Sequence, residues 1–261
     1  MSTFTHIEKC EEVFTLFAEL SLMQDIQALV ISLAGSDARQ QKVRSELEQT
    51  SLPWHFLDAV RGASLKDNPK EYKPEKVKRL LGFELTPNEL GCFLSHKKAW
   101  QECVDKNIAT IVFEDDFFLL PHFEKTVHFL MTECKGWSAV RLQGLSEVPQ
   151  EKIQAGEEIN LVRNIGDAVG ATAYLIKPEA AQILLDASTD IYEPLDHFLE
   201  HYQKHHLEFL AINPYPVDIT GAQTTIADRP GRLPIRGLAK LKRSVSRALD
   251  RWLSKNPWFP S

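Results

Sequence analysis

The feature that most constrains this chain is a short apolar run that ends at three adjacent carboxylates. Five of the six residues from Ile108 to Phe113 are apolar, and Glu114, Asp115 and Asp116 follow directly. Such a run, bounded by polar residues, is typical of a fully buried strand, most simply a central strand of a parallel sheet. Ligands in open α/β sheets bind beyond the carboxyl ends of the strands. The three acids are therefore expected at a binding or active site.

The three carboxylates repel one another, and no Lys or Arg lies next to them in the sequence. A hard divalent cation such as Mg²⁺ or Mn²⁺ would relieve this repulsion, because it binds carboxylate oxygens and keeps positions for substrate phosphates. Side chains alternate along an extended chain, so Glu114 and Asp116 are expected on one side and Asp115 on the other. The alternative is a solvated acidic loop without a chemical role.

Length and cysteine usage narrow the class of protein. A chain of 261 residues suits one large domain or one domain with an appendage. The four cysteines form no CxxC pair and no histidine completes a zinc-finger spacing, which favours a reducing compartment and no structural zinc. No basic leader with an apolar core opens the chain, and no run approaches 18 apolar residues. Neither a secretory signal nor a membrane-spanning helix is expected.

Charge is distributed unevenly along the chain. Residues 229–255 contain nine Lys or Arg and one acid, Asp250, which gives +8 and leaves −14 for the rest of a chain with formal charge −6. On a helical wheel from Arg236 to Leu253, basic and apolar residues occupy opposite sides, a pattern typical of a helix lying on an anionic membrane. The alternatives are a helix docked on the acidic body or a nucleic-acid tail. The apolar stripe argues against nucleic acid as a partner.

The body of the chain opens with the order strand, helix, strand. Strands are expected over 26–34 and 54–57, with a helix over 38–49 between them, which is typical of the first half of a Rossmann-like sheet. No GxGxxG follows the first strand, which argues against a dinucleotide site. Residues 63–85 are polar and Lys-rich, and we expect a surface excursion there.

Two later segments carry candidate catalytic residues. Thr86, Pro87 and Glu89 form a capping-box start for a helix over 87–106, which contains His96. A lone histidine there is more often a hydrogen-bonded core residue than a catalyst. Asp196 stands at the start of another helix, where a plain N-terminal cap and a chemical role are equally consistent with the spacing. Between these segments, small residues over 167–173 would allow a ligand to approach the backbone closely.

Taken together, several motifs resemble glycosyltransferase family 25, which includes bacterial lipooligosaccharide β-1,4-galactosyltransferases. They occur in family order: VISLAGSDARQQKV, FLDAVRG, LTPNELGCFLSHKKAW, IVFEDDF, GATAYLIKPEAAQ, PLDHFL and TTI. The resemblance covers about four-fifths of the chain. It implies a GT-A-like α/β fold, with a Rossmann-type mixed sheet flanked by helices. It also implies a UDP-sugar donor, UDP-galactose foremost, and inverting transfer to a lipid-linked oligosaccharide acceptor.

The resemblance, together with the chemistry that inverting transfer requires, suggests roles for individual residues. Glu114 and Asp116 would hold the divalent metal, Mn²⁺ or Mg²⁺, on the donor diphosphate, in the manner of a DxD element. Asp196 is the candidate base that takes the acceptor proton, with His96 and Glu200 as weaker candidates. The donor is expected to contact a set of residues near the strand ends: Ser32, Leu33, Arg39, Asp58, Ala59, Glu114, Asp115 and Gly170.

Three parts and three functions remain as hypotheses. We expect an amphipathic helix packed on the body within residues 1–25, a catalytic domain over 26–228, and a basic membrane-associating tail over 229–261. This tail would place the protein on the inner face of the cytoplasmic membrane.

The first of the three functional hypotheses is a metal-dependent glycosyltransferase. The second is another nucleotide-using metal enzyme, a nucleotidyltransferase or phosphohydrolase, and the lone Gly35 after the first strand argues against it. The third is a catalytically inactive, membrane-bound glycan-binding protein.

Overall fold

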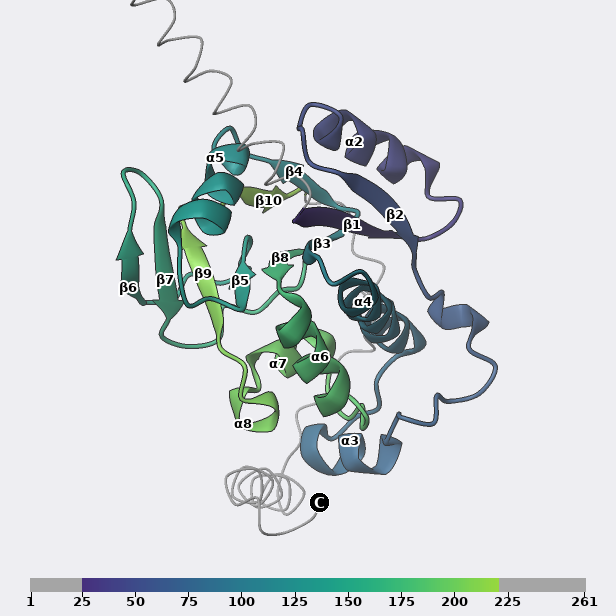
Figure 1. The fold of residues 1–261 in the computed structure, drawn as a ribbon. Coiled ribbons are helices and arrows are strands. Elements are labelled where there is room, and N and C mark those ends of the chain that lie inside the picture. The colour runs from purple at the N-terminus through teal and green to yellow at the C-terminus, as the bar shows by residue number, and fades with distance from the viewer. Residues whose placement is uncertain (1–24, 221–261) are drawn as a thin grey trace, which may run out of the picture.

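A large mixed β-sheet with helices on both faces organises the computed structural model, which describes residues 25–220 (Figure 1). The sheet has eight strands in the order β2-β1-β3-β8-β5-β9-β7-β6. Its strands are β1 (Ile26–Ser32), β2 (Trp54–Asp58), β3 (Ala109–Glu114), β5 (Ala139–Arg141), β6 (Gln150–Ala155), β7 (Asn160–Asn164), β8 (Ala173–Ile176) and β9 (Phe209–Asn213). The mixed α/β fold expected from the sequence is confirmed.

The strand directions refine the expectation for the run before the acids. Strands β2, β1 and β3 are parallel, so their carboxyl ends meet at one edge. On its other side β3 pairs with β8 in antiparallel orientation. The prediction of a buried central strand is right, and so is the mixed sheet implied by the family resemblance, although the apolar run by itself most simply indicated parallel neighbours on both sides. Burial alone could not decide this, because a strand covered on both faces is apolar whichever way its neighbour runs.

Alternating side chains of the central strands enter two separate cores. In β1, Ala28 and Val30 face one core, while Leu29 and Ile31 face the other. The helices α2 (Asp37–Leu47) and α5 (Phe123–His128), the second followed by a π-helical turn (Phe129–Glu133), cover the first core. The second core is covered by α3 (Pro74–Leu81), α4 (Pro87–Lys106), α6 (Pro178–Ala187) and α7 (Leu195–Glu200).

Helix α4 starts as its sequence predicts. Glu89 N donates to Thr86 Oγ1 at 3.2 Å, and Thr86 N donates to Glu89 Oε2 at 2.8 Å, which completes the capping box. Phe93 and Trp100 are fully buried against Phe198 of α7. The capping-box start and the apolar spacing that the sequence predicted for this helix are both confirmed, because neither depends on distant contacts.

The segment expected as a polar surface excursion is more ordered than its composition indicates. It contains a 3₁₀ turn (Gly62–Ser64) and α3, whose Val77 and Leu80 are buried. The Tyr72 hydroxyl accepts a hydrogen bond from Leu85 N at 3.0 Å and so links the residues on either side of α3. The composition did not reveal this helix, because three apolar residues in about two turns suffice to dock a helix whose other positions are mostly lysines, an arginine and an acid.

A second, two-stranded sheet lies beside the acids. Strands β4 (Phe117–Leu119) and β10 (Val217–Ile219) form a separate antiparallel pair next to the acids. The expected helix in residues 1–25 and the tail over 229–261 lie outside the described residues, as does the TTI motif. Within residues 25–220, no helix combines the length and apolar character needed to cross a membrane.

Helix α8 (Tyr202–His205) ends in a buried histidine that gives the fold a pH dependence. His205 Nε2 donates to Phe198 O, and His205 Nδ1 accepts from Leu207 N, both at 3.0 Å. Burial lowers the pKa of His205 to about 4, and the Phe198 carbonyl opposes this shift. A histidine in the unfolded chain takes up its proton near pH 6.5, whereas His205 in the folded protein does so only near pH 4. The neutral, buried His205 therefore favours the folded state fully above pH 6.5, and this stabilisation is lost as the pH falls from 6.5 toward 4.

We therefore expect the free energy of unfolding to fall by about 3 kcal/mol more in the parent than in His205→Gln between pH 6.5 and pH 4. Urea unfolding at the two pH values measures this difference. The exposed His128→Gln serves as the control and should behave as the parent does. Equal losses in the parent and His205→Gln would contradict the assignment.

Candidate active site

A pocket of about 300 Å³ lies at the edge where β1, β2 and β3 end, and the first turns of α4 form its other wall. Proteins commonly bind ligands at this position in α/β sheets. The pocket is lined by Ile31, Leu33, Ser36, Arg39, Ala59, Val60, Arg61, Gly62, Ala63, Asn88, Cys92, Ser95, His96, Glu114, Asp115 and Asp116.

Two glycines bring the loop after β2 against α4. A Cβ atom on Gly91 would lie 2.4 Å from Val60 O, and one on Gly62 would lie 2.2 Å from Pro87 O. Ser95 Oγ accepts a hydrogen bond from Val60 N at 2.8 Å and donates to Gly91 O at 2.6 Å. Backbone therefore packs directly on backbone, which places the 59–63 loop and the cluster on α4 on opposite walls of one pocket.

The middle carboxylate of the triplet is neutralised by a residue far away in the sequence. Asp115 Oδ1 pairs with Arg39 Nη1 at 2.8 Å, and Asp115 Oδ2 accepts from Ser32 Oγ at 2.7 Å. The charge of Asp115 raises the pKa of Arg39, since the hydrogen bond favours the charged guanidinium. Strand β3 ends at Glu114, and residues 115–116 form a turn, so all three acids line the pocket. Asp115 and Glu114 contact different neighbours, Ser32 and Arg39 for the first and Cys92 and His96 for the second.

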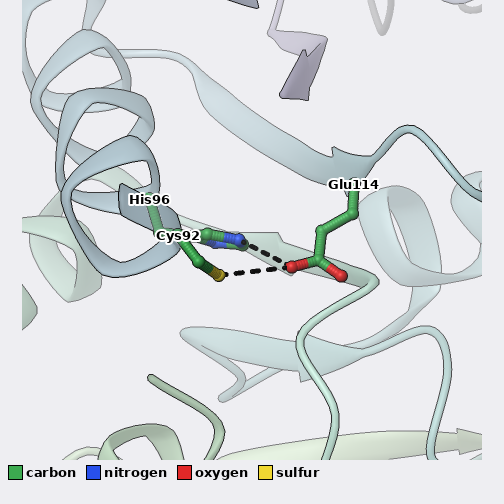
Figure 2. Close-up of side chains that lie close together, drawn as sticks. All are labelled: Cys92, His96 and Glu114. Carbon is green, nitrogen blue, oxygen red and sulfur yellow. Dashed lines mark hydrogen bonds and ion pairs between the residues drawn. The ribbon is translucent and has the colours of Figure 1, made fainter. Parts of the chain in front are cut away.

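Glu114 lies within reach of two residues of α4 (Figure 2). Cys92 Sγ is 3.4 Å from Glu114 Oε1, and His96 Nε2 is 3.6 Å from the same oxygen. Burial on its own raises the pKa of Glu114, but the imidazole of His96 outweighs it and holds the pKa below its ordinary value. Burial, followed by the charge of Glu114, raises the pKa of the Cys92 thiol well above its usual value.

Asp116 carries a buried oxygen that no described residue satisfies. Its Oδ1 has no hydrogen-bond partner among residues 25–220. Burial and then the charge of Glu114 raise the pKa of Asp116 to about 6. A carboxylate in this state is destabilised unless a cation or proton joins it. Glu114 and Asp116 thus bring two carboxylates into one pocket, one of them with an unsatisfied buried oxygen, and this donor set suits a hard divalent cation.

His96 is held from behind by a buried hydrogen-bonded chain. His96 Nδ1 is 2.8 Å from Tyr174 Oη, which also accepts from Trp100 Nε1 at 2.8 Å. All three side chains are at most 1% exposed. The prediction that His96 is a hydrogen-bonded core residue is consistent with these contacts, and its second nitrogen nevertheless faces the pocket carboxylate.

Asp196 lies at the first turn of α7 and does not line the pocket. Its Oδ1 accepts from His197 N at 2.9 Å, while Pro194 is the N-cap residue and makes no side-chain cap bond. Asp196 is partly exposed, and its charge helps to raise the pKa of Cys92 behind the stronger effects of burial and Glu114.

The carboxylate of Glu200 is already engaged by other residues of the fold. Its Oε1 pairs with Arg141 Nη2 at 2.8 Å and accepts from Val169 N at 3.0 Å. Burial raises the pKa of Glu200, against the opposing charge of Arg141. The Arg141 guanidinium also donates to Gly170 O, and Val169 and Gly170 both have positive φ values, 54° and 88°. The pair holds this irregular segment in place beside Thr172, whose carbonyl accepts from Glu114 N at 2.9 Å.

The structure brings seven of the predicted site residues to the pocket lining: Leu33, Arg39, Ala59, His96, Glu114, Asp115 and Asp116. Ser32 lies just behind and bonds to Asp115. The Asp58 side chain is exposed, and its carbonyl accepts from Lys98 Nζ. Sequence reasoning did not single out Cys92, Arg61 or Asn88. The spacing of Cys92 and His96, four residues apart on one helix face, is the signal that would have found the first.

Comparison with known proteins gives a consistent set of relatives. The model of glycosyltransferase family 25 (LPS biosynthesis protein) matches residues 25–199. The inactive glycosyltransferase 25 family member 3 of Mus musculus is 31% identical, over 69% of this chain and 32% of that protein. Procollagen galactosyltransferase 2 of Homo sapiens is 26% identical, over 77% of this chain and 37% of that protein. The lipooligosaccharide biosynthesis protein lic2B of Haemophilus influenzae is 27% identical, over 59% of this chain and 60% of that protein. This chain thus spans about a third of the length of the two animal relatives.

Proposed function

Because this chain belongs to glycosyltransferase family 25, we propose that it transfers a hexose, galactose foremost and in β-1,4 linkage, from a UDP-sugar to the glycan of a lipooligosaccharide or lipopolysaccharide. The observation that carries the proposal is the pocket at the strand ends, where Arg39 pairs with the middle one of three carboxylates and a buried oxygen of the third is unsatisfied. The name of lic2B, a lipooligosaccharide biosynthesis protein, supports a lipooligosaccharide acceptor. The name of procollagen galactosyltransferase 2 supports a galactose donor.

Glu114 and Asp116 would hold the divalent cation, Mn²⁺ or Mg²⁺, in this proposal. When bound, the cation supplies charge stabilisation for the departing diphosphate and orients it. Arg39 stands next to the same acids and adds a guanidinium, a group suited to bind phosphate oxygens bidentately. Leu33 and Ala59 belong to the apolar part of the lining, where the nucleoside would lie.

The base of the reaction is proposed to be Asp196. Inverting transfer is a single displacement, in which a carboxylate takes the proton from the acceptor hydroxyl as that oxygen attacks the anomeric carbon. One Asp196 oxygen is engaged by His197 N, which fixes the side chain and leaves the other oxygen for the proton. Glu200 is the weaker candidate, because its carboxylate is already paired with Arg141.

The proposal is tested by measuring UDP release from UDP-galactose with and without manganese and with and without a lipooligosaccharide acceptor. Release that needs both metal and acceptor supports a glycosyltransferase. Metal-dependent release of a sugar phosphate or nucleoside monophosphate would favour the other nucleotide-using enzyme. UDP binding without any turnover would overturn the proposed activity, and some relatives are named as inactive.

Residues 229–261 lie outside the described part of the chain, and we propose that they hold the protein on an anionic membrane. Their nine basic residues and apolar stripe support this, at roughly 1 kcal/mol of attraction per Lys or Arg near the surface. The full-length protein is expected to pellet with anionic vesicles at low salt, and a protein ending at residue 231 is expected to stay in solution. Vesicles of neutral lipid are the control. Equal pelleting of the two proteins would contradict a membrane role for this segment.

A further inference from the structure

The geometry points to a tetrahedral site for a borderline divalent metal, zinc foremost, formed by Cys92 Sγ, His96 Nε2 and Glu114 Oε1 with a fourth position open to the pocket. This inference goes beyond the proposed function, whose cation is held by carboxylates alone. A thiol and an imidazole suit zinc, whereas Mg²⁺ and Mn²⁺ take oxygen ligands. The sequence excluded zinc only in the form of paired cysteines, and this set is assembled by tertiary contact between α4 and β3.

Two of the distances within the cluster are close to those between the ligands of a tetrahedral metal. The His96 Nε2 to Glu114 Oε1 distance is 3.6 Å, which exceeds the range of an N–H···O bond. The Cys92 Sγ to Glu114 Oε1 distance is 3.4 Å. A tetrahedral zinc with Zn–S of about 2.3 Å and Zn–N and Zn–O of about 2.0 Å separates its ligand atoms by about 3.3–3.6 Å. All three ligand atoms lie within 4.8 Å of one another.

His96 provides an independent indication of a ligand. The residue is fully buried, and its Nε2 has no hydrogen-bond partner among residues 25–220. Leaving such a nitrogen unpaired costs free energy, which coordination would recover. The atom is aimed at Glu114 from a helix whose first turn is fixed by its capping box (Figure 2).

The hydrogen bonds behind His96 are those of a metal-bound imidazole. Tyr174 Oη has two lone pairs, of which one accepts from Trp100 Nε1 and the other is available to His96 Nδ1–H. The proton then sits on Nδ1 and leaves Nε2 free to coordinate. Binding displaces the Cys92 thiol proton to solvent, as metal binding to cysteine requires.

The fourth coordination position of the proposed metal is open to the pocket. All three ligand residues line the pocket, so the open side of the metal faces the space in which a substrate would lie. Three protein ligands with one open position are the pattern of zinc sites that bind a water or a substrate oxygen. Glu114 Oε2 takes no part in this set, so it remains for the cation that Asp116 would share.

Cobalt is the probe that tests the site in the full-length protein, because Co²⁺ occupies zinc sites and reports a thiolate ligand by charge-transfer absorption in the near ultraviolet. One equivalent of Co²⁺ added to chelator-treated protein should give this band together with tetrahedral visible bands, and one equivalent of zinc should remove both. Cys92→Ser should abolish the charge-transfer band. Cys134→Ser removes a buried thiol outside the cluster and should leave it unchanged.

Further variants and a protection experiment distinguish loss of this site from loss of the carboxylate site and from misfolding. Asp116→Asn should keep the cobalt band even if it abolishes transfer, so failure of one site does not imply failure of the other. Tyr174→Phe should weaken cobalt binding roughly 10–100-fold, as loss of an imidazole partner does. In the parent protein, zinc should protect Cys92 from alkylation, read by peptide mass spectrometry. Absence of the thiolate band, its survival in Cys92→Ser, or alkylation of Cys92 at the same rate with and without zinc would overturn the assignment.

Discussion

Replacing Asp116 with asparagine is expected to lower transfer about a hundredfold or more at saturating donor and metal, while the fold stays intact. The change removes one anionic ligand of the proposed cation and keeps the size of the side chain. Charge stabilisation by a bound cation is worth several kcal/mol, and about 1.4 kcal/mol corresponds to a tenfold change in rate. Because Asp116 Oδ1 has no hydrogen-bond partner among the described residues, its loss breaks no bond within that part of the protein.

The rate of UDP release at several manganese concentrations measures this effect. The matched control is Asp105→Asn, which makes the same change on the exposed side of α4 and should leave the rate unchanged. The unfolding midpoint of Asp116→Asn should equal or exceed that of the parent, because the variant removes repulsion between Asp116 and Glu114. Transfer within about threefold of the parent would refute Asp116 as a metal ligand.

The second large effect is expected at Asp196. If this carboxylate is the base, Asp196→Asn should lower turnover by about 10²–10⁴-fold, the usual range for general-base catalysis, with donor affinity nearly unchanged. Asparagine keeps an oxygen that can accept from His197 N, so the first turn of α7 is preserved. The substitution therefore removes basicity and little else.

A rate assay together with calorimetry of UDP binding separates the alternatives for Asp196. A large fall in turnover at constant UDP affinity identifies the base, whereas an unchanged rate identifies a residue that only supports the helix start. Asp186→Asn, an exposed acid that accepts from Gln182 within α6, is the matched control. If Glu200→Gln lowers turnover at constant stability and Asp196→Asn does not, the base is Glu200 and the proposed assignment is wrong.

The residues that could be placed from the sequence are those governed by local rules. The start of α4 followed from Thr86 and Glu89, and the buried strand before the acids followed from its apolar run. Both signals act within a few residues, so distant contacts do not alter them. The family motifs added the expectation of a glycosyltransferase, and the match over residues 25–199 agrees with it.

The features that the sequence left undecided depend on how distant segments pack. The apolar run before the acids did not reveal that β8 pairs with β3 in antiparallel orientation. The polar composition of residues 63–85 did not reveal α3, because a short helix needs only a few buried apolar residues. Periodicity alone could not supply either point, since strand direction and helix docking are set by partners that lie far away in the sequence.

By itself, the sequence determined the α/β class, the capped helix and the position of the acids at a strand end, because these follow from short-range pattern and backbone geometry. Only the tertiary structure decided which charges meet. Arg39 reaches Asp115 across 76 residues, and Cys92 and His96 reach Glu114 from another element. Such contacts depend on strand order and on the close approach allowed by Gly62 and Gly91. No pattern along the chain encodes a distance in space, so the electrostatics of the pocket became visible only once β1, β3 and α4 were packed together.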